Sequence, residues 1–438
     1  MTSVQIAAAN PTIEVSVPDV VFKPITAVVW DTEPSISPGE IAHSQELGAL
    51  VREQQYDEAL VRLSSSEAPL SAPFELLRGQ LYSMRKDYDS AINAYKAALK
   101  LAPNFTRAHA GLGTLFLVKG DYKNAQAHLS DAVSLGAADA QTYGQLGYLN
   151  VKRGNPWGGV SAYQRALMLE PDNRQWKSGL LLALTESGQQ HAALSLLGSM
   201  LNESPTNAAL WQQRAALSLR DDNYISAFAS LEVSLRLGAD SSTNRQAAAQ
   251  LAVQLGNARR AAQLASAAAL SANSDLAFIS QVADWMVTNG KKRYAKDILK
   301  AMSKQRGNYG AAQLSRFHYI KGRVAELDGN PNQAYTDFRL ATEQDGSNGQ
   351  ALLAYAESAL GQNRPSRAQV IYQRLEVLAD YRQQAMVGQA KALIALGDYP
   401  AALQQLQKTL SEYPAAYELS SAIQSLRNIV NASRNSTS

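Results

Sequence analysis

The sequence of 438 residues contains no cysteine, which excludes disulfide bonds, thiolate nucleophiles and cysteine metal sites. Charged residues make up only 18% of the chain, below the usual share of about 25%. The formal net charge of +3 does not by itself predict nucleic-acid binding. No apolar run approaches the ~18 residues that would span a bilayer. The chain therefore has no cysteine chemistry and no bilayer-spanning run, and its overall charge does not indicate a partner.

Catalytic and metal-binding motifs are also missing. The His-Glu-x-x-His zinc pattern is absent. Gly111-Leu112-Gly113 begins a dinucleotide-like fingerprint, but Phe116 replaces its third glycine and no strand precedes it. We therefore expect no enzyme, no cofactor and no metal site. An active site built between repeats is the alternative, which a buried pair of acids with shifted pKa values would favour. All five histidines fall on expected helices, with no two of them three or four residues apart: His43, His109, His128, His191 and His318.

What the sequence does contain is a pattern that recurs every 34 residues. Gly79, Gly113 and Gly147 follow this period, and so do Ala91 and Ala125. Each unit holds two runs with apolar residues three and four apart, such as 74–85 and 88–101, which predicts a pair of amphipathic helices. Small residues mark the point where the two helices cross closely. One pair cannot bury its apolar face alone, so neighbouring pairs must stack.

A resemblance to the tetratricopeptide repeat family is carried by residues 79–103, which read GQLYSMRKDYDSAINAYKAALKLAP. The similarity is strongest over residues 74–170. It implies an all-α fold in which helix-turn-helix repeats form a right-handed superhelix, an α-solenoid. It also implies a non-catalytic binding scaffold.

The period divides the chain into ten clear repeats and one degenerate one. An overlong repeat is expected to hold its extra residues in a loop at Gly307–Gly310. The proline-rich N-terminal arm would be extended and would pack along the solenoid or stay loose, or alternatively would add a strand to a partner's sheet edge. The segments are the arm (1–38), a degenerate first repeat and link (39–71), a regular array (72–275), the overlong repeat (276–314), further repeats (315–416), a capping helix (417–430) and a polar tail (431–438).

The family resemblance implies that the second, fifth, ninth and twelfth residues of each repeat line a concave groove. Amides and apolar side chains together suit an extended or helical peptide from a partner protein. Alternatively, the aliphatic members pack only against neighbouring helices. The Lys and Asn pair of the family's carboxylate clamp is missing, so a chaperone adaptor is not expected. The predicted groove residues are Gln80, Thr114, Leu117, Gln141, Tyr148, Val151, Gln175, Leu182, Gln212 and Gln246.

Basic residues gather in the overlong repeat, where Asp297 is the only acid between positions 291 and 323. This cluster is either a solvated helix face or a docking site for an acidic protein, a polyanionic glycan or lipid head groups. Nucleic acid is less favoured, because few aromatic residues are interleaved. The basic cluster consists of Lys291, Lys292, Arg293, Lys296, Lys300, Lys304, Arg306, Arg316, Lys321 and Arg323.

We interpret the chain as a scaffold within a multiprotein bacterial envelope assembly, such as a secretion, pilus, polysaccharide-export or TonB-type system. This interpretation rests on a loose resemblance and predicts a periplasmic location. The first ten residues lack the basic region and long apolar core of a signal peptide, although Ala7–Ala9 resembles the remnant of a cleavage site. A cytoplasmic scaffold or regulator is the alternative.

Overall fold

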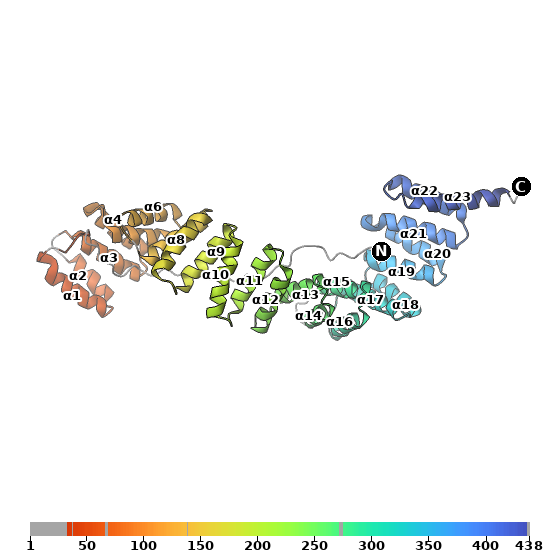
Figure 1. Ribbon diagram of the computed structural model, residues 1–438, viewed down its shortest axis with the longest axis horizontal. Helices are drawn as coiled ribbons and strands as arrows, with labels where there is room; N and C mark the ends of the chain where they lie inside the picture. Colours follow the sequence, from red (N-terminus) through yellow and green to blue (C-terminus); the bar gives the residue numbers. More distant parts are fainter. Residues whose placement is uncertain (1–32, 37, 66–68, 138, 271–274, 436–438) are drawn as a thin grey trace. The chain divides into compact units, whose positions relative to one another are not determined.

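The computed structural model describes residues 33–36, 38–65, 69–137, 139–270 and 275–435. These residues contain 23 α-helices and no strand (Figure 1), which confirms the all-α fold. Most of the predicted N-terminal arm, including the possible strand, lies outside the described residues. The described residues divide into an N-terminal unit, which ends at Asp221, and a C-terminal unit, which begins at Asp222.

The N-terminal unit stacks antiparallel helix pairs in sequence order. Within each pair the two helices pack together, and the first helices of successive pairs, α3, α5, α7 and α9, also contact one another. We call this row of first helices the first-helix face. The helices are α1 (Ile41–Arg52), α2 (Tyr56–Ser64), α3 (Ala72–Met84), α4 (Tyr88–Leu101), α5 (Thr106–Val118), α6 (Tyr122–Ser134), α7 (Ala140–Lys152), α8 (Pro156–Leu169), α9 (Arg174–Glu186), α10 (Gln190–Glu203) and α11 (Ala208–Arg220), after a short 3₁₀ helix η1 (Pro38–Glu40).

The C-terminal unit repeats this arrangement, with α13, α15, α17, α19 and α21 forming its first-helix face. The final helix packs on α22, and its Ile423, Leu426 and Val430 are buried, as a capping helix requires. The elements are α12 (Tyr224–Arg236), α13 (Ser242–Gln254), α14 (Ala258–Ala269), α15 (Leu276–Thr288), α16 (Lys292–Lys304), η2 (Arg306–Asn308), α17 (Ala311–Leu327), α18 (Pro331–Gln344), α19 (Gly349–Gly361), α20 (Pro365–Glu376), η3 (Ala379–Tyr381), α21 (Arg382–Ala395), α22 (Tyr399–Glu412) and α23 (Leu419–Asn435).

Glycine allows the helices to approach each other around large aromatic rings. A Cβ atom on Gly79 of α3 would lie 2.7 Å from the Tyr95 ring, and one on Gly111 of α5 would also lie 2.7 Å from it. Tyr95, on α4, is therefore held between the first helices of two successive repeats and is only 4% exposed. The same arrangement places Tyr163 between Gly147 and Gly179. The predicted close crossings are present, and each ring also joins neighbouring repeats.

Most second helices begin at an Asp or Asn whose side chain caps the first turn. Asp87, Asp121, Asn155, Asn223 and Asn257 each accept a hydrogen bond from the backbone N–H three residues ahead. Such caps contribute about 1 kcal/mol each. They follow the 34-residue period, so the sequence fixes the start of these helices locally.

The overlong repeat differs from the sequence prediction. The expected loop at 307–310 is partly a 3₁₀ turn, and most of the extra length instead extends α17, which has 17 residues where α15 has 13. At the C-terminus, α23 continues to Asn435, so the first residues of the predicted polar tail are helical. No helix of the described part is long and apolar enough to cross a membrane.

Candidate peptide-binding groove

A cavity of about 580 Å³ lies on the first-helix face of the N-terminal unit. Its walls come from α1, α3 and the start of α5, and include the predicted groove residue Gln80 together with Phe74 and Leu77. A segment of the chain itself, 33–36, forms the remaining wall. The helices of the groove therefore already contact a non-helical stretch of polypeptide that precedes the first repeat.

A charged contact anchors this segment. The backbone N–H of Arg107 donates to Glu33 Oε1 over 3.1 Å, and the Arg107 guanidinium donates to Glu33 Oε2. The Glu33 side chain is only 3% exposed. Phe105, the N-cap of α5, provides no side-chain cap, so the carboxylate occupies the positive end of this helix. Arg107 is the second residue of its repeat, a groove position that the sequence prediction left out.

Two predicted groove residues are packing residues in the structure. Thr114 is 8% exposed, and its hydroxyl donates to Gln145 Oε1 over 3.0 Å, which links α5 to α7. Leu117 is 5% exposed and packs with Leu129 and Leu149. For Leu117 the structure agrees with the alternative of simple helix packing.

Three predicted groove residues on α7 are half-buried. Tyr148 lies with its ring centroid 5.6 Å from Lys152 Nζ, and burial raises the pKa of its hydroxyl. Val151 packs against the core formed by α8 and α9, whereas Gln141 lies at the start of the helix. Part of the Tyr148 side chain is therefore accessible on the first-helix face.

The remaining predicted amides differ in their surroundings. Gln175 is half-buried, and its Nε2 donor has no hydrogen-bond partner among the described residues; the same holds for Gln145 Nε2. Gln212 is 8% exposed, and Leu182 is half-buried. Gln246 lies on α13, in the C-terminal unit, and is also half-buried. Buried donors without partners are costly, so the half-buried Gln175 of α9 would gain most from a polar ligand, whereas Gln145 is fully buried.

The C-terminal unit carries a polar network on its own first-helix face. The Arg323 guanidinium lies 3.4 Å from Asp284 and 3.2 Å from Glu326, and donates to the Tyr319 hydroxyl over 3.0 Å. Burial raises the pKa of both carboxyls, against the opposing effect of Arg323. These residues occupy the fifth, ninth and twelfth positions of their repeats. They are therefore groove positions by the same numbering that gave the predicted groove residues, although that predicted set ends at Gln246.

Ion pairs divide the predicted basic cluster into two groups. Lys292 and Lys296 lie 2.9 and 2.8 Å from Asp328, and Lys321 lies 2.9 Å from Asp337. Arg323 belongs to the network above. The other six are exposed and have no ion pair within the described residues: Lys291, Arg293, Lys300, Lys304, Arg306 and Arg316. The local excess of positive charge is therefore smaller than the composition of residues 291–323 implies, because the paired acids Asp284, Asp328 and Asp337 lie outside that segment.

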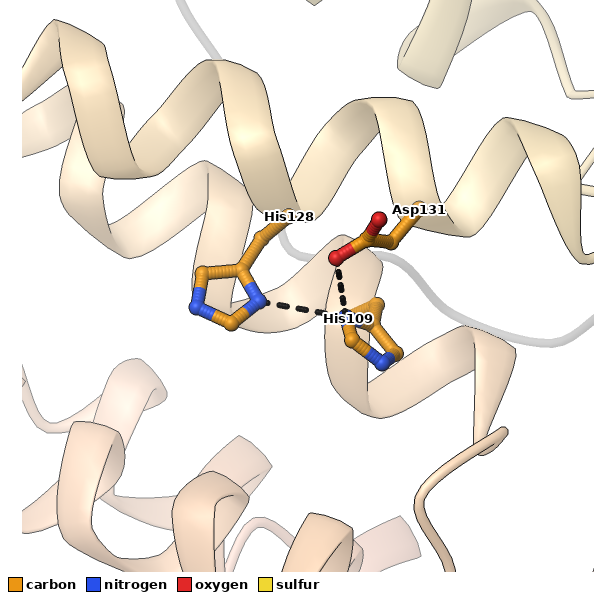
Figure 2. Close-up of side chains that lie close together, drawn as sticks. All are labelled: His109, His128 and Asp131. Carbon is orange, nitrogen blue, oxygen red and sulfur yellow. Dashed lines mark hydrogen bonds and ion pairs between the residues drawn. The ribbon is translucent and has the colours of Figure 1, made fainter.

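A third group of polar residues was not predicted. His109 of α5 lies beside His128 and Asp131 of α6 (Figure 2), with the two Nδ1 atoms 3.1 Å apart and His109 Nδ1 3.6 Å from Asp131 Oδ2. Burial, His109 and Lys96 lower the pKa of His128, whereas Asp131 acts in the opposite direction. No two histidines lie three or four residues apart in the sequence, so histidine spacing alone does not indicate this group. A search for His and Asp three residues apart would have found His128 and Asp131.

Two segments of the chain, residues 82–146 and 353–417, match models of the tetratricopeptide repeat family. The chain carries tetratricopeptide repeats. Of the helices that line the groove, α5 lies within the first matched segment.

Curated relatives match only a limited part of the chain. Small glutamine-rich tetratricopeptide repeat-containing protein 2 of Saccharomyces cerevisiae is 27% identical over 115 residues, 26% of this chain and 33% of the relative. The protein of the same name from Mycosarcoma maydis is 30% identical over 95 residues, 22% of this chain and 27% of the relative. The matches thus span a third or less of these relatives.

Solved tetratricopeptide repeat structures are also similar. The crystal structure of YrrB, described as having an unusual peptide-binding site, is 21% identical with a TM-score of 0.39, covering 43% of this chain and 95% of its own. Yeast Tom70 is 13% identical with a TM-score of 0.37, covering 90% of this chain and 96% of its own.

Proposed function

We propose that this protein is a non-catalytic scaffold that binds extended segments of partner proteins along the first helices of its repeats. Tetratricopeptide repeats are typical protein-interaction modules, because an open stack of helix pairs leaves a long surface uncovered. The observation that carries the proposal is the cavity beside α1 and α3, whose wall includes residues 33–36, a segment outside the helices that Glu33 joins to Arg107.

The bound segment indicates what kind of ligand the groove prefers. Its Glu33 carboxylate receives both a backbone N–H and a guanidinium, and charge-assisted bonds of this kind contribute about 1.5–3 kcal/mol. Pro34 follows directly and favours an extended backbone at Glu33. We therefore propose that partner segments present an acidic residue to Arg107, in competition with Glu33.

Peptide binding tests this proposal directly. A labelled peptide with the sequence of residues 31–39 is titrated by fluorescence anisotropy into the full chain carrying Glu33→Ala, which frees Arg107. We expect binding that weakens at least about tenfold, or 1.4 kcal/mol, when Arg107→Ala is added. A peptide with Gln in place of its Glu should weaken by a similar factor.

The matched control is Arg153→Ala, which removes another arginine from the same unit, at the end of α7. It should leave the affinity unchanged. Equal affinity in the chains with and without Arg107 would contradict an acidic ligand in this groove.

The enzyme alternative has one feature in its favour, the raised pKa values of Asp284 and Glu326. Arg323 lies between these acids and contacts both, which is the arrangement of a structural ion-pair network. Neither acid lines the cavity beside α1 and α3. We therefore favour a binding role over catalysis.

The six exposed, unpaired bases of the basic cluster support a second binding surface. We propose that it attracts an acidic protein or a polyanionic glycan, because exposed like charges create a local positive field. Nucleic acid and lipid head groups are less favoured.

The proposed setting is a bacterial envelope assembly in the periplasm, with a cytoplasmic scaffold or regulator as the alternative. Only the loose sequence resemblance supports the envelope, and the curated relatives come from fungi and a nematode. Release of the native protein by osmotic shock would support the periplasm. Retention with cytoplasmic markers would contradict it.

A further inference from the structure

The side chains of His109, His128 and Asp131 converge within a single repeat. His109 comes from α5, whereas His128 and Asp131 lie three residues apart on the antiparallel helix α6 and so share one of its faces (Figure 2). One ligand atom from each residue lies within 4.8 Å of the other two. The group is separate from the groove residues and the basic cluster described above.

The hydrogen bonds of His109 fix which of its nitrogens carries the lone pair. Its Nε2 lies 3.0 Å from the backbone carbonyl oxygen of Pro103, which can only accept, so Nε2 carries the proton. In the neutral ring Nδ1 is then the acceptor and points toward His128 and Asp131. Histidines that bind metals usually donate their second ring N–H to a carbonyl or carboxylate in this way.

The distances fit the first coordination shell of a metal ion. Ligands about 2.0–2.1 Å from a tetrahedral Zn²⁺ lie about 3.3 Å from one another. The observed separations from His109 Nδ1 are 3.1 Å to His128 Nδ1 and 3.6 Å to Asp131 Oδ2. The ligand atoms of all three residues lie within 4.8 Å of one another, and movement of the Asp131 side chain, which is 56% exposed, would bring its carboxylate to the tetrahedral spacing.

Neighbouring residues contact the rings of His109 and His128, whereas the Asp131 side chain is exposed. The His128 ring stacks on Phe116, with centroids 5.6 Å apart and planes 10° apart. The His109 side chain is 12% exposed and is fixed by Pro103. The exposed carboxylate of Asp131 lies on the solvent side, where an ion would enter. Two partly buried imidazoles and an exposed carboxylate form a donor set suited to borderline divalent metals such as Zn²⁺.

We propose that His109, His128 and Asp131 bind a divalent transition-metal ion of the Zn²⁺ class. The ion joins the two helices of one repeat through His109 Nδ1, His128 Nδ1 and a carboxylate oxygen of Asp131. These three protein ligands leave a fourth position of a tetrahedral site, which water or a donor atom of a bound partner can take. Metal then stabilises the repeat and offers a contact point outside the groove.

Metal titration of the full, tag-free chain tests this inference. After removal of metal with a chelator, Zn²⁺ is titrated in competition with a chromophoric indicator, and Co²⁺ is added to report geometry by its visible absorption. We expect one site per chain and the intense bands of four-coordinate Co²⁺. His128→Ala should weaken Zn²⁺ binding more than about 100-fold, because loss of a direct ligand exceeds the usual cost of a supporting residue.

Asp131→Asn is the variant that tests the site without disturbing packing, because its side chain is exposed. Because the asparagine amide oxygen can still ligate but carries no charge, this variant should weaken binding only about tenfold and alter the Co²⁺ spectrum, while circular dichroism stays unchanged. His191→Ala, which removes an exposed histidine from α10, is the matched control and should bind as the unmodified chain does. Absence of a tight site in the unmodified chain, or equal affinity in Asp131→Asn and His191→Ala, would overturn the proposal.

Discussion

At the scale of single residues, glycines determine how closely neighbouring repeats can stack. Gly179 of α9 lies against Tyr163, and a Cβ atom there would be 2.3 Å from the ring carbon Cζ. Tyr163 is 2% exposed, so the ring has little room to move away. We expect Gly179→Ala to destabilise the N-terminal unit by about 1–3 kcal/mol, the usual cost of overpacking. Thermal unfolding followed by circular dichroism measures the change.

A second glycine provides the control for this substitution. Gly198 lies inside α10, and nothing lies within 4 Å of the Cβ position. Gly198→Ala should therefore stabilise the helix by about 0.5–1 kcal/mol, because alanine loses less backbone entropy on folding. A shift of the same sign for both variants would show that contact with Tyr163 does not determine the requirement for glycine.

The sequence revealed only part of this residue-level arrangement. Gly79 and Gly147 were recognisable because close crossing within a repeat demands a small residue at one periodic position. Their counterparts Gly111 and Gly179 were not, since they contact an aromatic ring of the preceding repeat. The contact between Glu33 and Arg107 was hidden for a similar reason, because it joins residues 74 positions apart. Contacts between repeats depend on the stacking geometry rather than on the local pattern.

At the scale of helices, the start of α16 departs from the periodic capping. Lys291 occupies the N-cap and makes no side-chain cap bond, and the first turn contains no acid. Lys292 and Arg293 follow directly, so positive charges gather at the positive end of the helix dipole, which costs stability. This unfavourable arrangement is consistent with a binding role for the exposed members of the basic cluster.

Replacing the uncapped residue tests this interpretation of α16. Lys291→Asn should stabilise α16 by about 1 kcal/mol, because asparagine can accept a bond from the first turn and the substitution removes a positive charge. Hydrogen exchange of the α16 amides measures the gain. The reverse change at the equivalent position of α14, Asn257→Ala, should cost about 1 kcal/mol. Unchanged protection in Lys291→Asn would mean that the cap position does not limit the stability of this helix.

Helix positions were predictable where apolar residues and caps follow the 34-residue period. They were less predictable where a repeat contains extra residues. The sequence predicted an overlong repeat over 276–314 and assigned its excess to a loop. Ala311-Ala312-Gln313-Leu314 are good helix formers, and Gln313 Oε1 accepts a bond from the Gly310 N–H, over 2.9 Å. Gly310 therefore begins a longer helix instead of continuing the loop, which no periodic template specifies.

At the scale of the whole molecule, the placement of charge matters more than its sum. The formal net charge is only +3, yet six exposed bases of the basic cluster have no ion pair among the described residues. Arg293, Lys300 and Lys304 are seven and four residues apart along α16, so they share one helix face. A polyanion should therefore bind here more strongly than the net charge predicts.

Charge reversal distinguishes a local site from a general effect. We expect the full chain with Arg293→Glu, Lys300→Glu and Lys304→Glu to elute from a heparin column at markedly lower salt, because the field at this face reverses sign. A control with Lys100→Glu, Lys123→Glu and Arg220→Glu, three exposed bases of the N-terminal unit, has the same formal net charge. It should elute close to the unmodified chain. If both triple variants eluted at equally reduced salt, polyanion binding would depend on the total charge of the chain. The exposed bases of α16 would then serve solubility rather than recognition.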